Sequence, residues 1–227
     1  MKHLARIVAL GDSILKGVQV DPVSKRYVTR NEIGIPDLER DFDLTVRNDS
    51  HFGASTVKGE RLLDRMLERG DCCDGVVMDF GGNDCDYDWK AISADPDGEH
   101  LPHTPSERFI DGYCTAIRKA RQAGARVAMT SLPPLEQSRY FSFITKGLSA
   151  ENILRWLGDT DHLYRWQEYY NDMITQLSRA FGCRLVDLRA EFLKSRVFPS
   201  LIGADGIHPT QAGHDLIHQS VQTALSY

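Results

Sequence analysis

The sequence lacks the marks of a secreted, membrane-bound or disulfide-stapled protein. Its five cysteines are odd in number and form no C-x-x-C pair, so neither a disulfide framework nor a zinc site is indicated. No apolar run approaches the length of a membrane span, and residues 1–6 lead into a strand-like run without an apolar signal segment. We therefore expect a reducing, cytoplasmic location and no membrane partner.

The sequence also lacks the features by which proteins bind phosphate chains. It has 27 Lys and Arg against 32 Asp and Glu, a net charge of -5, and no run of basic residues, so nucleic acid is not an expected partner. No Gly-x-Gly-x-x-Gly follows the first strand-like run and no Gly-x-x-x-x-Gly-Lys occurs. The usual nucleotide-binding loops are therefore absent from the sequence.

What the sequence does contain is enough apolar material for one domain, which we place at residues 1–227 with 41% hydrophobic residues. Helical patterns, the clearest beginning near Thr104, Asp161 and Thr210, alternate with strand-like runs. Thr104 and Glu107 fit a capping box. This alternation predicts an α/β fold, a three-layer α/β/α sandwich around a mainly parallel sheet. The strand-like runs lie at about residues 4–10, 44–48, 76–80, 126–132 and 184–188.

Two connections are longer than the usual few residues and are candidates for functional loops. Residues 85–103 are rich in Asp, Pro and His, and residues 133–160 include a short helical pattern at 150–157. We expect both connections to wall a ligand crevice. Trp156 lies in the short helical pattern. It fits either a residue that covers the substrate or one that anchors this connection to the rest of the domain.

Four short motifs lie after strand-like runs or before the last helix, and each alone allows an ordinary structural role. Ser13 fits a helix N-cap as well as a nucleophile, Asn83 fits a turn, and His208 fits a surface histidine. In this order the motifs resemble those of the SGNH (GDSL-type) hydrolase family over nearly the whole chain, with Ile14 where that family often has Leu. The motifs are Gly11-Asp12-Ser13-Ile14, residues 48–56, Gly81-Gly82-Asn83-Asp84 and Asp205-Gly206-Ile207-His208.

The resemblance implies a five-stranded, flavodoxin-like sheet and a serine hydrolase mechanism without a cofactor. In that mechanism Ser13 forms an acyl-enzyme, His208 is the general base and Asp205 orients the histidine. The resemblance also implies an oxyanion hole made by the backbone N–H groups of Ser13 and Gly53 and by the Asn83 amide.

Four further residues are candidates for the surroundings of the substrate. Asp12 and Asp84 are interpreted as residues that bind backbone amides around the crevice. His51 lies close enough to Gly53 in sequence to border the substrate, and Trp156 is the fourth candidate.

The last predicted helix contains His214 and His218, which are four residues apart. This spacing raises the alternative interpretation of a metal site. The segment lacks the glutamate of the H-E-x-x-H motif and an evident third ligand, so we expect no metal.

The expected substrate is a small ester with a short acyl group, a sugar acetyl ester being somewhat favoured by the polar residues beside Asn83. Lysophospholipase, thioesterase or acyltransferase activity on the same residues remains open, as does a non-catalytic small-molecule-binding α/β domain. Neither the natural ester nor the oligomeric state follows from the sequence.

Overall fold

The computed structural model describes residues 5–30 and 34–226, and a five-stranded sheet runs through its centre. Every neighbouring pair of these strands is parallel, in the order β4-β1-β5-β6-β7. Numbered among themselves along the chain, the strands follow the flavodoxin-like order 2-1-3-4-5, as predicted. The strands are β1 (Ala5–Gly11), β4 (Leu44–Asn48), β5 (Gly75–Asp79), β6 (Arg126–Thr130) and β7 (Arg184–Val186).

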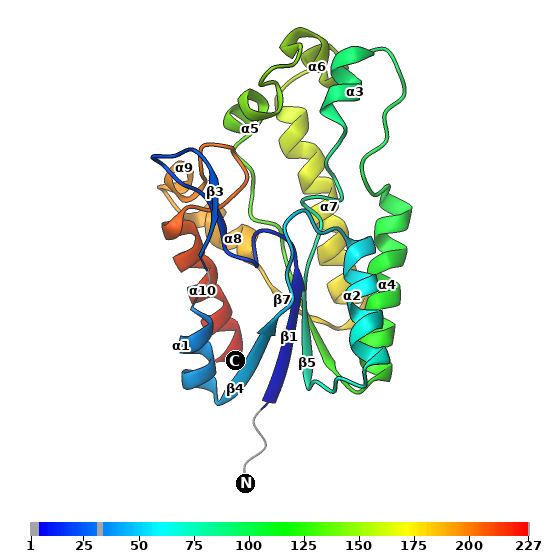
Figure 1. Ribbon diagram of the computed structural model, residues 1–227, viewed down its shortest axis with the longest axis vertical. Coiled ribbons are helices and arrows are strands. Elements are labelled where there is room, and N and C mark those ends of the chain that lie inside the picture. The colour runs from blue at the N-terminus through cyan, green and yellow to red at the C-terminus, as the bar shows by residue number, and fades with distance from the viewer. Residues whose placement is uncertain (1–4, 31–33, 227) are drawn as a thin grey trace.

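Helices cover both faces of the sheet, which confirms the three-layer α/β/α sandwich (Figure 1). One face carries α2 (Thr56–Glu68), α4 (Ser106–Gln122) and α7 (Asp161–Phe181). The other carries α1 (Ile35–Phe42) and α10 (Gln211–Leu225). The short helices α8 (Leu188–Lys194) and α9 (Phe198–Leu201) pack against α10.

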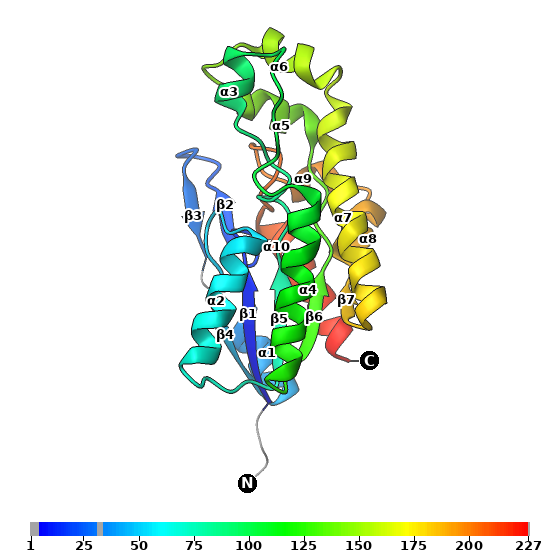
Figure 2. The same ribbon diagram turned by 90° about the vertical axis from the view of Figure 1, so that its right-hand side faces the viewer.

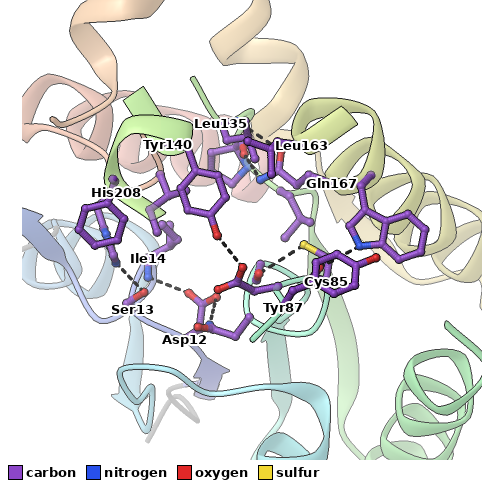
Figure 3. A pocket seen from close by; sticks show the side chains of 18 of the residues that line it. Asp12, Ser13, Ile14, Cys85, Tyr87, Leu135, Tyr140, Leu163, Gln167 and His208 are labelled. Carbon is purple, nitrogen blue, oxygen red and sulfur yellow. Dashed lines mark hydrogen bonds between the residues drawn. The ribbon is translucent and has the colours of Figure 1, made fainter. Parts of the chain in front are cut away.

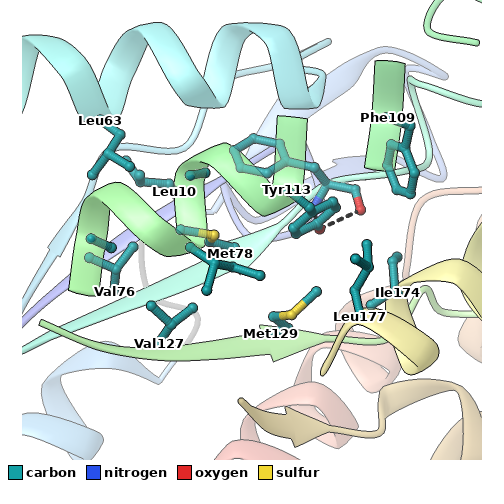
Figure 4. Packing of buried hydrophobic residues seen from close by; sticks show 14 of the residues in the cluster. Leu10, Leu63, Val76, Met78, Phe109, Tyr113, Val127, Met129, Ile174 and Leu177 are labelled. Carbon is teal, nitrogen blue, oxygen red and sulfur yellow. Dashed lines mark hydrogen bonds between the residues drawn. The ribbon is translucent and has the colours of Figure 1, made fainter. Parts of the chain in front are cut away.

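The main hydrophobic core lies between the sheet and the helices α2, α4 and α7 (Figure 4). Leu10 of β1 and Met78 of β5 point into it, and Tyr113 of α4 is buried beside them. The Tyr113 hydroxyl donates to the Phe80 carbonyl at 2.9 Å and accepts from the Phe80 N–H at 3.1 Å. These bonds hold the chain where it leaves β5 toward Gly81 and Asn83.

The observed starts of the helices agree in part with those predicted from the sequence. α10 begins after Thr210, whose hydroxyl accepts from the Gly213 N–H. The capping box expected at Thr104 is wrong, because α4 begins one residue after Pro105 and no side chain caps it. Thr104 is buried and hydrogen-bonds Asp84 instead, so a tertiary contact takes the place of the local cap.

A cap of short helices lies beyond the carboxyl ends of the strands (Figure 2). It consists of α3 (Trp89–Ala94), α5 (Gln137–Ile144), α6 (Ala150–Leu157) and the start of α7, and it has its own buried cluster. The two long connections supply α3, α5 and α6. The two connections therefore cover the carboxyl ends of the strands.

A hairpin that the sequence analysis did not predict follows β1. Its strands β2 (Val18–Val20) and β3 (Tyr27–Thr29) pair antiparallel and form a separate two-stranded sheet beside the strand ends. Within the described part of the chain, no helix is both long and apolar enough to cross a lipid bilayer.

Candidate active site

Three side chains from the two ends of the chain form a continuous hydrogen-bonded row. Ser13 lies just after β1, in the turn that follows Gly11. Its Oγ is 2.9 Å from Nε2 of His208, and Nδ1 of His208 is 2.6 Å from Oδ2 of Asp205. All three residues are buried, so little solvent competes for these bonds.

The loop before α10 fixes the acid and the histidine relative to each other. Oδ1 of Asp205 accepts the backbone N–H groups of Ile207 and His208, and Gly203 N donates to the His208 carbonyl at 2.7 Å. Gly206 has a φ of 81°, and a Cβ there would stand 2.3 Å from the backbone nitrogen of Tyr140. Glycine is therefore required for the loop to lie against α5.

The charge of Asp205 is stabilised by what surrounds it. Burial alone would raise the pKa of its carboxyl, but the hydrogen bonds and the charge of His208 outweigh burial and lower the pKa. An ionised carboxylate at this position accepts the Nδ1 proton of His208 and leaves Nε2 free to accept a proton from Ser13.

Two backbone N–H groups of the predicted oxyanion hole lack a protein acceptor. Within residues 5–30 and 34–226, neither the N–H of Ser13 nor that of Gly53 donates a hydrogen bond. Gly53 has a φ of 67°, in the loop that follows β4. Because β4 and β1 are adjacent in the sheet, the two residues follow neighbouring strand ends.

Asn83 follows β5, the other neighbour of β1. Its Nδ2 donates to Oδ2 of Asp12 at 3.0 Å and to the carbonyl of Ala54 at 3.0 Å. These two acceptors fix the orientation of the amide, because only its nitrogen end can face both of them. Both amide hydrogens are engaged, so a third acceptor would have to share one.

Asp12 connects the Asn83 amide with the backbone that follows Ser13 and with a second buried carboxyl. Its Oδ1 accepts the Ile14 N–H at 2.8 Å, and its carboxyl lies near the buried carboxyl of Asp79. Burial and the charges of Asp79 and Asp84 raise the pKa of Asp12 well above its ordinary value. Burial also raises the pKa of Asp79, although the hydroxyl of Thr130 donates to it.

Asp84 joins the loop that carries Asn83 to the start of α2. Its carboxylate accepts the N–H of Thr56, the first residue of α2, and the Thr56 hydroxyl at 2.6 Å. It is completely buried and does not line the cavity beside Ser13. The geometry assigns Asp84 to the support of the loop that carries Asn83.

A cavity of about 330 Å³ opens beside Ser13 and runs under the cap (Figure 3). Ser13, His208 and Asp12 lie at one side of it, and Cys85 and Tyr87 lie across the empty space. Both long connections contribute to its wall, as expected from the sequence. Apolar side chains dominate the part under the cap: Leu132, Pro133, Leu135, Tyr140, Leu157, Leu163 and Trp166.

Two polar side chains in the wall of this cavity, Gln167 and Asp86, already have protein partners. Gln167 accepts from the Leu135 N–H and donates to the Pro133 carbonyl. Oδ1 of Asp86 accepts the Tyr140 hydroxyl at 2.6 Å and the indole N–H of Trp89 at 2.8 Å. The inner part of the cavity therefore behaves as an apolar pocket.

Three of the four residues proposed to surround the substrate, Asp84, His51 and Trp156, do not line this cavity. His51 precedes Phe52 in the loop after β4, and its Nδ1 contacts the Asp49 carbonyl at 2.8 Å. Trp156 packs edge-on against Tyr87, with ring centroids 4.8 Å apart, one layer behind the lining. Trp156 therefore supports the wall through Tyr87.

Sequence reasoning missed several aromatic residues that line the cavity, among them Trp166, Tyr27 and Phe52. Helical spacing alone favours a core position for Trp166 of α7, but its indole N–H donates to the Cys85 carbonyl and its ring borders the cavity. Tyr27 and Phe52 border the same cavity near His208. Of these three, only Phe52 carried a signal in the sequence, because it precedes Gly53 of the predicted oxyanion hole. Tyr27 comes from the hairpin that was not predicted.

The two histidines of α10 have separate surroundings. Nε2 of His214 contacts the Val18 carbonyl at 3.2 Å, and burial lowers the pKa of the ring. The ring of His218 lies against Gly34. No group of three His, Cys, Asp or Glu side chains in the described part of the chain could hold a metal ion.

Solved structures with the same fold cover almost the entire chain. An acetylxylan esterase mutant from Geobacillus stearothermophilus matches with a TM-score of 0.70 and 14% identity, over 100% of this chain and 97% of that one. A lipase/acylhydrolase from Enterococcus faecalis matches with a TM-score of 0.64 and 19% identity, over 98% and 96%. The esterase EstA from a Pseudoalteromonas species matches with a TM-score of 0.60 and 17% identity, over 97% and 96%. At these identities the likeness shows the fold.

No curated protein matches the chain. The family comparison is more specific, since a family model matches residues 9–216, from β1 into α10. The chain therefore belongs to the GDSL-like lipase/acylhydrolase family.

Proposed function

We propose that this protein is a serine esterase that cleaves carboxylic esters through an acyl-enzyme on Ser13. The observation that carries the proposal is the row from Ser13 Oγ through His208 to Asp205, with distances of 2.9 and 2.6 Å. A serine hydroxyl needs a base within hydrogen-bonding distance, and the base needs a partner that fixes its tautomer. His208 and Asp205 meet both requirements.

In the proposed reaction, Ser13 Oγ attacks the ester carbonyl as His208 Nε2 takes its proton. The tetrahedral intermediate expels the alcohol, which receives that proton from His208. Water then attacks the acyl-enzyme by the same route and releases the acid. The electron pair of each broken C–O bond leaves with the departing oxygen, and His208 returns to its neutral form after each half-reaction.

The developing oxyanion needs donors that are in place before the reaction. The unpaired N–H groups of Ser13 and Gly53 support this role, since they have no protein acceptor to give up. Asn83 would be the third donor and would share a hydrogen that now faces Asp12 or Ala54.

The cavity supports an acyl group longer than acetyl. With about 30 Å³ for a group the size of water, a two-carbon acyl group would leave most of the 330 Å³ cavity empty. Burial of each methylene adds about 0.8 kcal/mol, and apolar side chains such as Leu135, Leu157 and Leu163 form much of the inner wall. We expect the best acyl chains to have about four to eight carbons, because the mouth takes part of the volume.

The test is hydrolysis of p-nitrophenyl esters with acyl chains from two to ten carbons by the wild type and by Ser13→Ala. A fluorophosphonate probe, located by peptide mass spectrometry, identifies the nucleophile. We expect turnover with a maximum at intermediate chain length, label on Ser13, and neither turnover nor label in the variant. A folded wild type that neither hydrolyses any ester of the series nor takes the label would overturn the proposal.

A further inference from the structure

Two aromatic rings stand half-exposed at the mouth of the cavity. Tyr27 of β3 is 41% exposed and Phe52, in the loop after β4, is 52% exposed, yet both line the cavity that contains Ser13. Their ring centroids are 5.3 Å apart. Single exposed apolar residues are common on proteins, but two touching rings at the opening of a cavity form a patch that a ligand can cover.

Both rings also contact the imidazole of His208. Tyr27 meets it edge-on with centroids 5.0 Å apart, and Phe52 lies nearly parallel to it, at 15° and 5.9 Å. The aromatic patch is therefore on the histidine side of Ser13. The apolar pocket under the cap, formed by residues such as Leu163 and Trp166, is a separate part of the same cavity.

The chemistry of ester cleavage decides which part of the substrate reaches this patch. The alcohol oxygen leaves as His208 Nε2 donates its proton to it, so the alcohol portion must lie on the histidine side. The acyl portion then points toward the apolar pocket. This assignment rests on the proposed function, because it needs His208 to act as the acid.

The hairpin that carries Tyr27 is fixed to the elements that hold the site. The Val18 N–H donates to the Ser13 carbonyl at 2.9 Å, and the Val18 carbonyl faces His214 of α10. The Gln19 amide donates to Gln211, at the first position of α10, at 3.2 Å. The ring of Tyr27 is thus held relative to both Ser13 and the helix that follows His208.

We propose that Tyr27 and Phe52 form a subsite that selects esters of ring-shaped alcohols. A six-membered ring, of a sugar or of a hydrocarbon, presents a flat C–H face that packs on an aromatic face. A linear alcohol offers less contact area and loses more conformational freedom on binding. The exposure of the two rings leaves room for an alcohol portion that extends into solvent.

The test compares two butyrate esters whose alcohols are both secondary and have six carbons, cyclohexyl butyrate and the open-chain 3-hexyl butyrate. The measured quantity is the ratio of their kcat/KM values. We expect wild type to favour the cyclohexyl ester, and the ratio to fall roughly three- to tenfold in Tyr27→Ala and in Phe52→Ala, the range for one aromatic contact. Val23→Ala, at the 88% exposed tip of the same hairpin, is the control and should keep the wild-type ratio.

The ratio separates substrate selection from a role in holding His208. If the rings only positioned the imidazole, both esters would lose kcat/KM equally and the ratio would not change, which would overturn the subsite. A wild type without preference for the ring would do the same. A wild type inactive on both esters and unlabelled by fluorophosphonate would instead overturn the proposed function, and with it the subsite.

A third ester, methyl 6-O-butyryl-glucopyranoside, tests whether the subsite accepts sugar rings as well as hydrocarbon rings. If its kcat/KM falls in Tyr27→Ala and Phe52→Ala as that of the cyclohexyl ester does, the subsite accepts sugars. A fall confined to the cyclohexyl ester assigns the subsite to hydrocarbon rings.

Discussion

Nε2 of His208 lies 2.9 Å from Oγ of Ser13 although 195 positions separate the two residues in the sequence. The contact follows from how the ends of the chain are placed. β1 occupies an inner position of the sheet, between β4 and β5, and presents Ser13 beyond its carboxyl end. The loop before α10 brings His208 over that end, and the His214 contact with the Val18 carbonyl ties α10 to the chain that leaves Ser13.

We expect Asp205→Asn to lower kcat about 10³- to 10⁴-fold, because an amide can hold His208 in the wrong tautomer. Steady-state kinetics on p-nitrophenyl butyrate measure the loss, and circular dichroism checks the fold. Asp215→Asn, an exposed change on α10, is the matched control. An Asp205→Asn enzyme within a few-fold of wild type would show that Asp205 does not orient the base.

We expect Asn83→Ala to lower kcat on the order of 100-fold with little change in KM, because the amide would act on the charge that develops in the transition state. The variant also frees Asp12 of a hydrogen bond, so its thermal stability must be measured beside the kinetics. An unchanged kcat, or a rise in KM alone, would exclude Asn83 from the oxyanion hole.

We expect Leu163→Trp to shorten the preferred acyl chain by about two carbons. Leu163 is buried in the wall of the apolar pocket, and each methylene that no longer fits costs about 0.8 kcal/mol, or roughly fourfold in kcat/KM. The measurement is the p-nitrophenyl ester series from two to ten carbons. Leu193→Trp, at a position that is 53% exposed on α8, should leave the profile unchanged. Identical profiles for the wild type and Leu163→Trp would place the acyl chain elsewhere.

We expect Asp79→Asn to stabilise the protein relative to wild type increasingly as pH rises. Burial raises the pKa of Asp79 and of its neighbour Asp12, so the folded state binds their protons more tightly than the unfolded chain does. The contribution of these two carboxyls to wild-type stability is therefore greatest when both are protonated, and it is lost from about pH 4 upward through the raised pKa values. The amide stays neutral and keeps an oxygen that can accept from Thr130.

The measurement is the difference in Tm between Asp79→Asn and wild type from about pH 4 to about pH 8. This difference should rise with pH. The exposed change Asp172→Asn should give a nearly constant difference. A difference that falls with pH would mean that the Asp79 charge stabilises the fold.

We expect Tyr113→Phe to lower the free energy of unfolding by about 1–3 kcal/mol, because it leaves the buried N–H and carbonyl of Phe80 without their partner. Urea denaturation measures this change. Tyr169→Phe, at a position that is 46% exposed on α7, should cost much less. Equal losses in the two variants would mean that the Phe80 contacts contribute little to stability.

The fold and the motifs were predictable because they depend on local pattern. Apolar runs bounded by Gly, Pro, Asp or Asn marked all five strands of the main sheet to within a few residues, and parallel strands must present their carboxyl ends at one edge. Ser13, Gly53 and Asn83 each follow such an end. Their meeting point therefore follows from alternation of strands and helices.

Side-chain orientation was not predictable in the same way. Helical spacing alone favours a core position for Trp166 of α7, but whether that ring faces the core or a cavity depends on the cap packed above it. Trp156 was proposed to touch the substrate, yet Tyr87 stands between it and the cavity. Thr104 fitted a capping box, and a buried contact with Asp84 removed it from that role.

The sequence by itself determined the order of strands and helices, the family motifs and the strand ends that carry Ser13, Gly53 and Asn83, because periodicity and turn residues act within a few positions of the chain. Only the tertiary structure decided that Tyr27 of the hairpin faces His208, that Asp86 and Gln167 are already paired, and that mostly apolar side chains line the cavity under the cap. These features join residues far apart in sequence, and their contacts exist only once the sheet, the hairpin and the cap have packed together.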